Sequence, residues 1–227
     1  MEYTILGTVM PMVELTMQRG EQVYAQAGAM QWMTYGVKMD TGMRGGIMGA
    51  LKRKISGEDM FVVNYTAAEN GEQIAFGHSF PGTILAVDVS EHSVICQSRA
   101  FVCAQSTVDY DIAIQRKLGV GLFGGEGFVM QRLSGAGIAF IELDGECVEK
   151  ELRAGEKIKV QTSAVGMFDS TVSMDIERIR GFKNMFLGGE GIFITTLTGP
   201  GRVWIQTMPA SNLAGEISSY ISTGEKK

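Results

Sequence analysis

An internal repeat constrains the fold more than any other feature of this sequence. The stretch Gly124-Gly125-Glu126-Gly127 returns 64 residues later as Gly188-Gly189-Glu190-Gly191. The same offset relates Ser106 to Ser170 and Leu133 to Leu197. Between residues 97 and 137, about 15 of roughly 41 positions are identical to the residue one period later, far above the level of unrelated sequence. The chain is therefore built from tandem copies of one unit.

A third, earlier copy is marked by a Gln followed three positions later by Ala. This pair occurs as Gln26 and Ala29, and returns at Gln97 and at Gln161. The first spacing is 71 residues and the second is 64, so the first copy carries about seven extra residues. Further identities place Ala75 at the position of Ala139, which puts part of the insertion before residue 57 and part around residues 67–71. The predicted repeats span about residues 1–82, 83–146 and 147–209 of a single compact unit.

The local patterns within each copy are those of short strands. Residues 60–65, 108–114 and 172–176 alternate with period two and are rich in β-branched and aromatic side chains. Turn-forming clusters that contain many of the 30 glycines separate these segments. We therefore predict an all-β barrel, prism or sandwich made of three similar units, whose stacking buries the face that each unit alone leaves open.

The texture changes after Pro209. Ser211 is a plausible N-cap, and Leu213, Ile217 and Tyr220 recur at helical spacing, so we predict a helix over residues 211–221. Its apolar stripe has two alternative roles: it caps one end of the β unit, or it docks on a neighbouring subunit.

Composition excludes several classes of function. The net charge of −5 gives the chain no basic field for a polyphosphate backbone, so we predict no nucleic-acid partner. The N-terminus lacks the pattern of a signal peptide, and no window approaches the length of a membrane span. We expect a soluble protein of the bacterial cytoplasm.

Cysteine and histidine supply little chemistry. The three cysteines match no zinc spacing, so we expect free thiols, with a redox or metal role as the alternative. His92 and Cys96 would share a strand face, but two ligands without a third make a weak metal site. No hydrolase motif is present. We predict no cofactor, no metal and no catalytic residue.

One carboxylate recurs in all three copies, as Glu58, Glu126 and Glu190. Three equivalent copies could form an acidic ring that takes a hard cation through oxygen ligands. Alternatively, each Glu accepts backbone N–H groups in its own Gly-rich turn. Features that every copy shares most simply serve the fold, so we favour the structural role.

A Gly-rich loop over residues 42–54 is the clearest feature that the first copy alone carries. Glycine and methionine give it an adaptable apolar character, and three consecutive cations end it. It either contacts a partner or a membrane surface, or it is a solvated hairpin tip. The candidate contact residues are Met43, Arg44, Ile47, Met48, Leu51, Lys52, Arg53 and Lys54.

The ordered set of motifs resembles the altered-inheritance-of-mitochondria family. It consists of Ala27-Gly28-Ala29-Met30, Gly57-Glu58, Pro81-Gly82, the two Gly-Glu-Gly turns and Thr198-Gly199-Pro200-Gly201. The resemblance implies a fold similar to the tryptophan RNA-binding attenuation protein (TRAP), a double-stranded β-helix-like unit repeated about a pseudo-threefold axis. It brings no catalytic residues, and RNA binding does not carry over to this acidic chain.

The sequence therefore predicts a non-catalytic β scaffold. We expect it to form a homo-oligomer and to engage a protein or membrane partner through the 42–54 loop and the terminal helix. The alternative is a small-ligand or metal-binding protein, or an enzyme, with its site between repeats or subunits.

Overall fold

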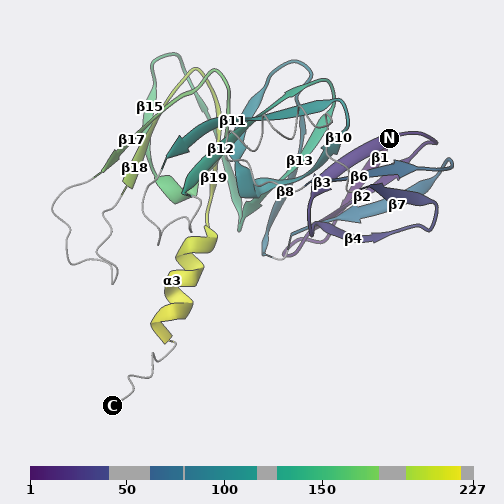
Figure 1. The fold of residues 1–227 in the computed structure, drawn as a ribbon. Helices are drawn as coiled ribbons and strands as arrows, with labels where there is room; N and C mark the ends of the chain where they lie inside the picture. The colour runs from purple at the N-terminus through teal and green to yellow at the C-terminus, as the bar shows by residue number, and fades with distance from the viewer. Residues whose placement is uncertain (41–61, 79, 117–126, 179–192, 221–227) are drawn as a thin grey trace.

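The computed structural model describes residues 1–40, 62–78, 80–116, 127–178 and 193–220. Within these residues the chain is almost entirely β-strand, with one α-helix at its C-terminal end (Figure 1). The predicted all-β class with a short C-terminal helix is confirmed.

The strands form three sets of six, preceded by β1 (Glu2–Leu6). The first set is β2 (Met12–Met17), β3 (Gln22–Gln26), β4 (Met30–Met33), β5 (Val37–Asp40), β6 (Val62–Ala67) and β7 (Glu72–Phe76). The second set is β8 (Gly82–Asp88), β9 (Val94–Gln97), β10 (Phe101–Gln105), β11 (Val108–Arg116), β12 (Phe128–Gly135) and β13 (Ile138–Asp144). The third set is β14 (Cys147–Leu152), β15 (Lys157–Gln161), β16 (Val165–Asp169), β17 (Ser173–Arg178), β18 (Phe193–Thr198) and β19 (Gly201–Gln206). Single-turn 3₁₀ helices occupy equivalent places, η1 (Ser98–Ala100) in the second set and η2 (Thr162–Ala164) in the third.

Strand formation follows from side-chain alternation. In β2, Val13, Leu15 and Met17 are fully buried, whereas the residues between them are partly exposed. Successive side chains of a strand point to opposite faces of the sheet, so this alternation buries one face.

All three sets share one pairing pattern. The sixth strand pairs with the first and the third, and the fifth strand pairs with the second and the fourth. Consecutive sets are joined by the second strand of one and the third strand of the next, which gives β3–β10 and β9–β16. We call these two pairings the internal joints.

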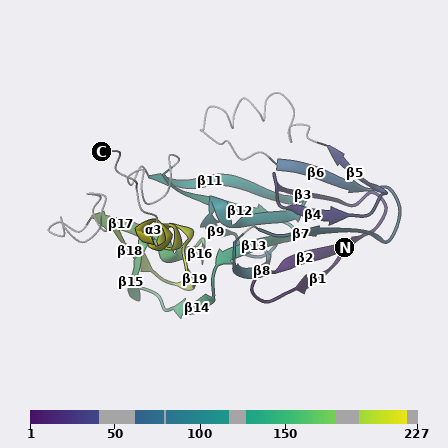
Figure 2. The same cartoon turned by 90° about the horizontal axis from the view of Figure 1, so that it is seen from below.

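The pairings produce four open sheets. In strand order, sheet 1 is β1-β2-β7-β4, sheet 2 is β5-β6-β3-β10-β13-β8, sheet 3 is β11-β12-β9-β16-β19-β14, and sheet 4 is β15-β18-β17. Sheet 1 lies at one end of the molecule and sheet 4 at the other, in two perpendicular views (Figures 1 and 2).

Three hydrophobic cores separate the four sheets. Core 1 contains Leu15 and Phe76 of sheet 1 with Ala25 of sheet 2. Core 2 lies between sheets 2 and 3, and core 3 lies between sheets 3 and 4. The middle sheets are therefore buried on both faces: in β3, Ala25 packs in core 1 and Tyr24 packs in core 2.

The predicted closure into a barrel or prism about a pseudo-threefold axis is not confirmed. Each repeat pairs only with its neighbour along the chain, and the sheets remain open at their edges. A closed arrangement would need β4 of the first repeat to pair with β15 of the third. These two strands do not pair with each other among the described residues.

Helix α3 (Ala210–Tyr220) follows the last strand and extends away from the sheets (Figure 1). Of the two alternatives for its apolar stripe, packing against the β unit does not describe its outer part, because Ile217 and Tyr220 are 51% and 85% exposed. The predicted N-cap, Ser211, lies inside the helix, and a carboxylate from β13 takes the capping role instead, as described below.

Candidate functional site

The loop and turn residues predicted from the sequence lie outside the described residues, but the strands that flank them are described. Asp40 of β5 pairs with Asn64 of β6, and the equivalent strands pair in the second and third repeats. The loop over residues 42–54 therefore belongs to the longest of three equivalent connections and is not an addition outside the repeat. The roles predicted for Met43, Arg44, Ile47, Met48, Leu51, Lys52, Arg53, Lys54, Glu58, Glu126 and Glu190 stay predictions.

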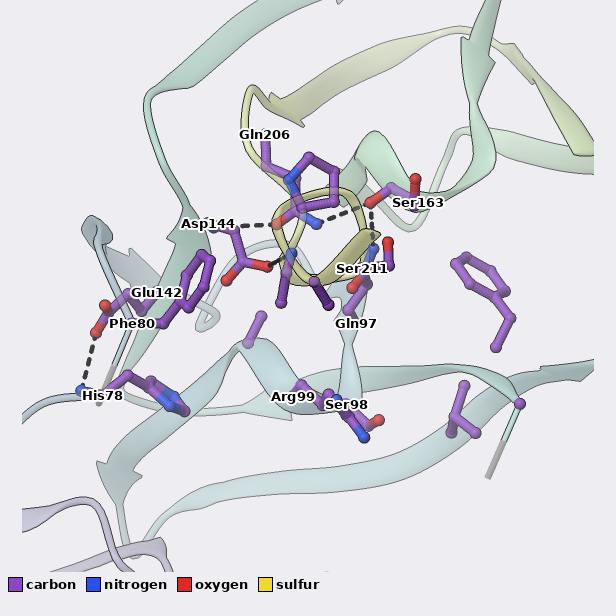
Figure 3. A pocket seen from close by; sticks show the side chains of 17 residues that line it. His78, Phe80, Gln97, Ser98, Arg99, Glu142, Asp144, Ser163, Gln206 and Ser211 are labelled. Carbon is purple, nitrogen blue, oxygen red and sulfur yellow. Dashed lines mark hydrogen bonds between the residues drawn. The ribbon is translucent and has the colours of Figure 1, made fainter. Parts of the chain in front are cut away.

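A cavity of about 430 Å³ lies where the second and third repeats meet the start of α3 (Figure 3). The end of β13 and the η1 turn come from the second repeat, and η2 and the end of β19 come from the third. His78 and Phe80 of the link between the first two repeats complete one side. The cavity is thus built at a junction that exists only because the repeats are stacked.

Glu142 of β13 is the most buried charged residue of the wall, with 4% of its surface exposed. Its Oε2 accepts a hydrogen bond from the backbone N–H of His78 at 3.1 Å. Burial raises the pKa of Glu142 to about 7; the negative charge of Asp144 also raises it, and the His78 hydrogen bond opposes the shift. Its charge therefore changes close to neutral pH.

His78 does not act as a cation in this site. Burial lowers its pKa, against the opposing effects of a backbone hydrogen bond at Phe101 and the charge of Asp144. Its Nε2 atom is buried without a hydrogen-bond partner. The imidazole is therefore neutral at pH 7, and this nitrogen is closed to solvent.

Asp144 ties the β-sheets to the helix. Its Oδ2 accepts a hydrogen bond at 2.8 Å from the backbone N–H of Ala210, the first residue of α3. Burial raises the pKa of Asp144, while the Ala210 hydrogen bond and electrostatic interactions with His78 and Arg99 act to lower it. A carboxylate at a helix N-terminus satisfies one of the unpaired N–H groups there.

Two glutamines hold the wall opposite β13. The carbonyl oxygen of Ser163 accepts hydrogen bonds from Nε2 of Gln97 at 3.1 Å and from Nε2 of Gln206 at 2.8 Å. Oε1 of Gln206 accepts from the backbone N–H of Asp144 at 3.1 Å. Gln97 is one of the glutamines that mark the repeat in the sequence, and its role is to hold this wall in place.

The cavity combines polar and apolar walls. Glu142 and Asp144 give it anionic groups, the exposed Arg99 gives a cation at one side, and Phe80 gives aromatic surface. This mixture suits an amphipathic small molecule.

The three thiols are held in their protonated form. All three cysteines are free, as predicted. Burial raises the pKa of Cys96 to about 12 and that of Cys147 to about 11, and it raises the pKa of Cys103 well above its usual value. Because the thiolate is the reactive form, Cys96 cannot serve as the nucleophile of a His92–Cys96 pair near neutral pH.

In the part of the chain that the structure describes, no group of three or more His, Cys, Asp or Glu side chains is placed to hold a metal ion. The described helices include none with the length and apolar character needed to cross a membrane.

Sequence reasoning missed Glu142 and Asp144 although a signal was present. Glu142 lies 64 residues before Gln206, so a carboxylate in one copy stands where a neutral amide stands in another. Because Glu142 lies within an apolar strand, the strand pattern did not indicate it as a candidate site residue.

The comparison with protein families decides the relationship of this chain. The model of the family described as Mitochondrial biogenesis AIM24 matches residues 3–208. The chain belongs to this family. The resemblance inferred from the motifs is therefore confirmed over nearly the whole sequence.

Two proteins of Streptococcus pyogenes are similar to this chain over most of their length. An uncharacterized protein of Streptococcus pyogenes serotype M6 is 29% identical over 222 residues, which cover 94% of this chain and 88% of the relative. A crystal structure of a protein from Streptococcus pyogenes superposes with a TM-score of 0.78 at 24% identity, covering 97% of this chain and 99% of that one. This likeness supports the fold alone.

Proposed function

We propose that this AIM24-family protein is a binding protein and not an enzyme, and that a small amphipathic molecule occupies the cavity between its second and third repeats. The observation that carries the proposal is the wall itself: Glu142 and Asp144 are held by backbone N–H groups on one side, and Phe80 lines the same space. The ligand we expect has a cationic or hydrogen-bond-donating group and an apolar body.

We favour binding over catalysis because the carboxylates of the cavity wall are engaged in hydrogen bonds that stabilise the fold. Glu142 and Asp144 each accept a backbone hydrogen bond, and Nε2 of His78 is buried without a hydrogen-bond partner. A general base must reach the proton that it removes, through a direct contact or one water. The arrangement supports recognition of a ligand without a proton-transfer step.

Native mass spectrometry of protein purified gently from its own cells tests the proposal. We expect a reproducible added mass on the wild-type chain. Ala214 of α3 lines the cavity, so Ala214→Trp fills it with a large side chain and should abolish the added mass.

The matched control is Ile217→Trp on the same helix. Ile217 is 51% exposed and does not line the cavity, so this variant should keep the added mass. A wild-type spectrum without added mass, or an Ala214→Trp spectrum that equals the wild type, would contradict ligand binding at this site.

A second candidate function is the predicted scaffold role, which the exposure of α3 favours. Ile217 and Tyr220 present apolar surface on a helix that stands away from the sheets (Figure 1). We propose that this helix and the 42–54 loop engage a protein or membrane partner, and that the helix also mediates self-association.

Sedimentation velocity tests the helix part of this candidate. Ile217→Ser combined with Tyr220→Ser should lower the sedimentation coefficient of any wild-type oligomer without changing the circular dichroism of the strands. Deletion of residues 43–53 should leave folding intact and abolish recovery of the partner. Unchanged assembly in the first case, or unchanged recovery in the second, removes the assignment concerned.

A further inference from the structure

The internal joints follow one rule at their central position. In the β3–β10 joint, Tyr24 lies opposite Ala104, and in the β9–β16 joint, Ile95 lies opposite Phe168. Both second-strand residues point into the core of the following repeat: Tyr24 packs in core 2 and Ile95 packs in core 3. The joint therefore buries one apolar side chain of each repeat in the next repeat.

The contacts of Tyr24 show how complete this burial is. Its ring is fully buried and stacks on Phe101 with centroids 5.3 Å apart, and its hydroxyl donates to the carbonyl of Val108 at 3.1 Å. Ile95 is 6% exposed. The residues two positions before and after them on the same face are polar in both repeats: Gln22, Gln26, Ser93 and Gln97.

The first and third repeats each carry one strand that is equivalent to a strand of the internal joints but forms no joint among the described residues. β15 is the second strand of the third repeat and pairs only with β18, and β4 is the third strand of the first repeat and pairs only with β7, among the described residues. β4 contains no charged residue and no proline, so nothing in its own sequence protects this edge. In the register of the internal joints, Trp32 of β4 would lie opposite Val160 of a second copy.

Lys159 occupies the central position of β15. The pairing within each repeat fixes the equivalence, because Tyr24 lies opposite Asn64, Ile95 opposite Arg132 and Lys159 opposite Thr196, each on the fifth strand of its own repeat. The Lys159 side chain is 67% exposed, and its Nζ lies 3.8 Å from the Glu177 carboxylate.

We infer that β15 and β4 form a complementary docking edge for a second copy of this chain, and that Lys159 keeps this edge closed to it. Docking in the register of the internal joints would carry the ammonium group of Lys159, which is now 67% exposed, out of water and into core 1 of the second copy. Moving a charged group from water into an apolar core is unfavourable, and lysine is a residue that proteins use to protect open sheet edges. The stack therefore ends after three repeats.

The inference goes beyond the proposed ligand site, because it concerns the opposite ends of the molecule. An end-to-end joint of this kind is heterologous, so copies joined through it would form a ring or an open filament. Lys159 thus prevents copies of the protein from joining end to end through this edge.

Sedimentation velocity of Lys159→Ile, which restores the residue of the second repeat, tests the inference. We expect assemblies that grow with protein concentration, whereas the wild type shows no assembly through this edge. Lys157→Ile is the matched control, since the equivalent residues Gln22 and Ser93 are polar, and it should sediment like the wild type.

A second substitution on the opposite edge identifies the contact. Trp32→Lys, added to Lys159→Ile, should return the protein to the wild-type sedimentation coefficient, because it places a charge opposite Val160 in the joint. Lys159→Ile protein that sediments like the wild type would overturn the inference. So would a wild-type oligomer that Trp32→Lys dissociates, since it would show that Lys159 leaves the edge open.

Discussion

At the scale of single residues, the position of Glu142 and Gln206 is where the repeat departs from its own rule. Each side chain accepts a backbone N–H from the preceding repeat, His78 in one case and Asp144 in the other. Gln206 also donates to the Ser163 carbonyl, which an ionised carboxylate cannot do. A carboxylate at 142 therefore titrates at its junction, whereas the neutral amide at 206 does not.

Glu142→Gln should change how stability depends on pH. The pKa of Glu142 is about 7 in the folded protein against 4.5 for the ordinary group, so the folded state binds the proton more tightly. Stability contributed by this group is full below pH 4.5 and is lost as the pH rises to about 7. In urea unfolding between pH 5 and 8, the free energy of unfolding of the variant should not show this loss, which is on the order of 1–3 kcal/mol.

The reverse exchange provides the matched control. Gln206→Glu replaces the Nε2 donor to Ser163 and should lower stability at pH 8 more than at pH 5. The raised pKa of Asp144 leaves a residual pH dependence in every variant. Parallel stability curves for wild type and Glu142→Gln would contradict the role assigned to Glu142.

At the scale of elements, helix α3 depends on a residue far away in the sequence. The sequence predicts its extent within a residue or so and places its cap at Ser211. The structure gives that role to Asp144, 66 residues before Ala210, because the end of β13 brings its carboxylate to the Ala210 N–H. Local sequence patterns predict local elements, but they do not predict a capping residue that the fold brings from a distant part of the chain.

Asp144→Ala should loosen the helix without unfolding the sheets. Loss of an N-cap costs about 1 kcal/mol, so hydrogen exchange of the α3 amides should quicken while that of β9 and β12 stays unchanged. Ser211→Ala should exchange like the wild type. Equal effects of the two substitutions, or none from Asp144→Ala, would contradict this assignment of the cap.

The sequence alignment of strands is correct in outline and shifted in one place. Identities pair Ala75 with Ala139. In the structure Ala75 lies opposite Trp32, whereas Phe140 lies opposite Cys103, the residue that matches Trp32 in the 71-residue spacing. The equivalent of Ala75 is therefore Phe140, so the turn before β7 holds one extra residue fewer than the identities indicate.

At the scale of the whole molecule, the repeat predicted three similar β units but not their assembly. Alternation within a strand shows that a face is buried; it does not show which repeat covers it. Tyr24 and Ile95 fill the core of the next repeat, and this property is visible only when the sheets are in place. The candidate cavity escaped prediction for the same reason, since its walls come from two repeats, the link before them and the helix.

The layered arrangement of four open sheets underlies both the cavity and the docking edge. Residue-resolved hydrogen exchange by NMR tests it most directly. The amides of β4 and β15 that do not pair with β7 and β18 should exchange rapidly, while the equivalent amides of β10 and β9, which pair across the internal joints, should be protected. Equal, slow exchange at all four strands would show that β4 and β15 are paired, and would contradict the open stack.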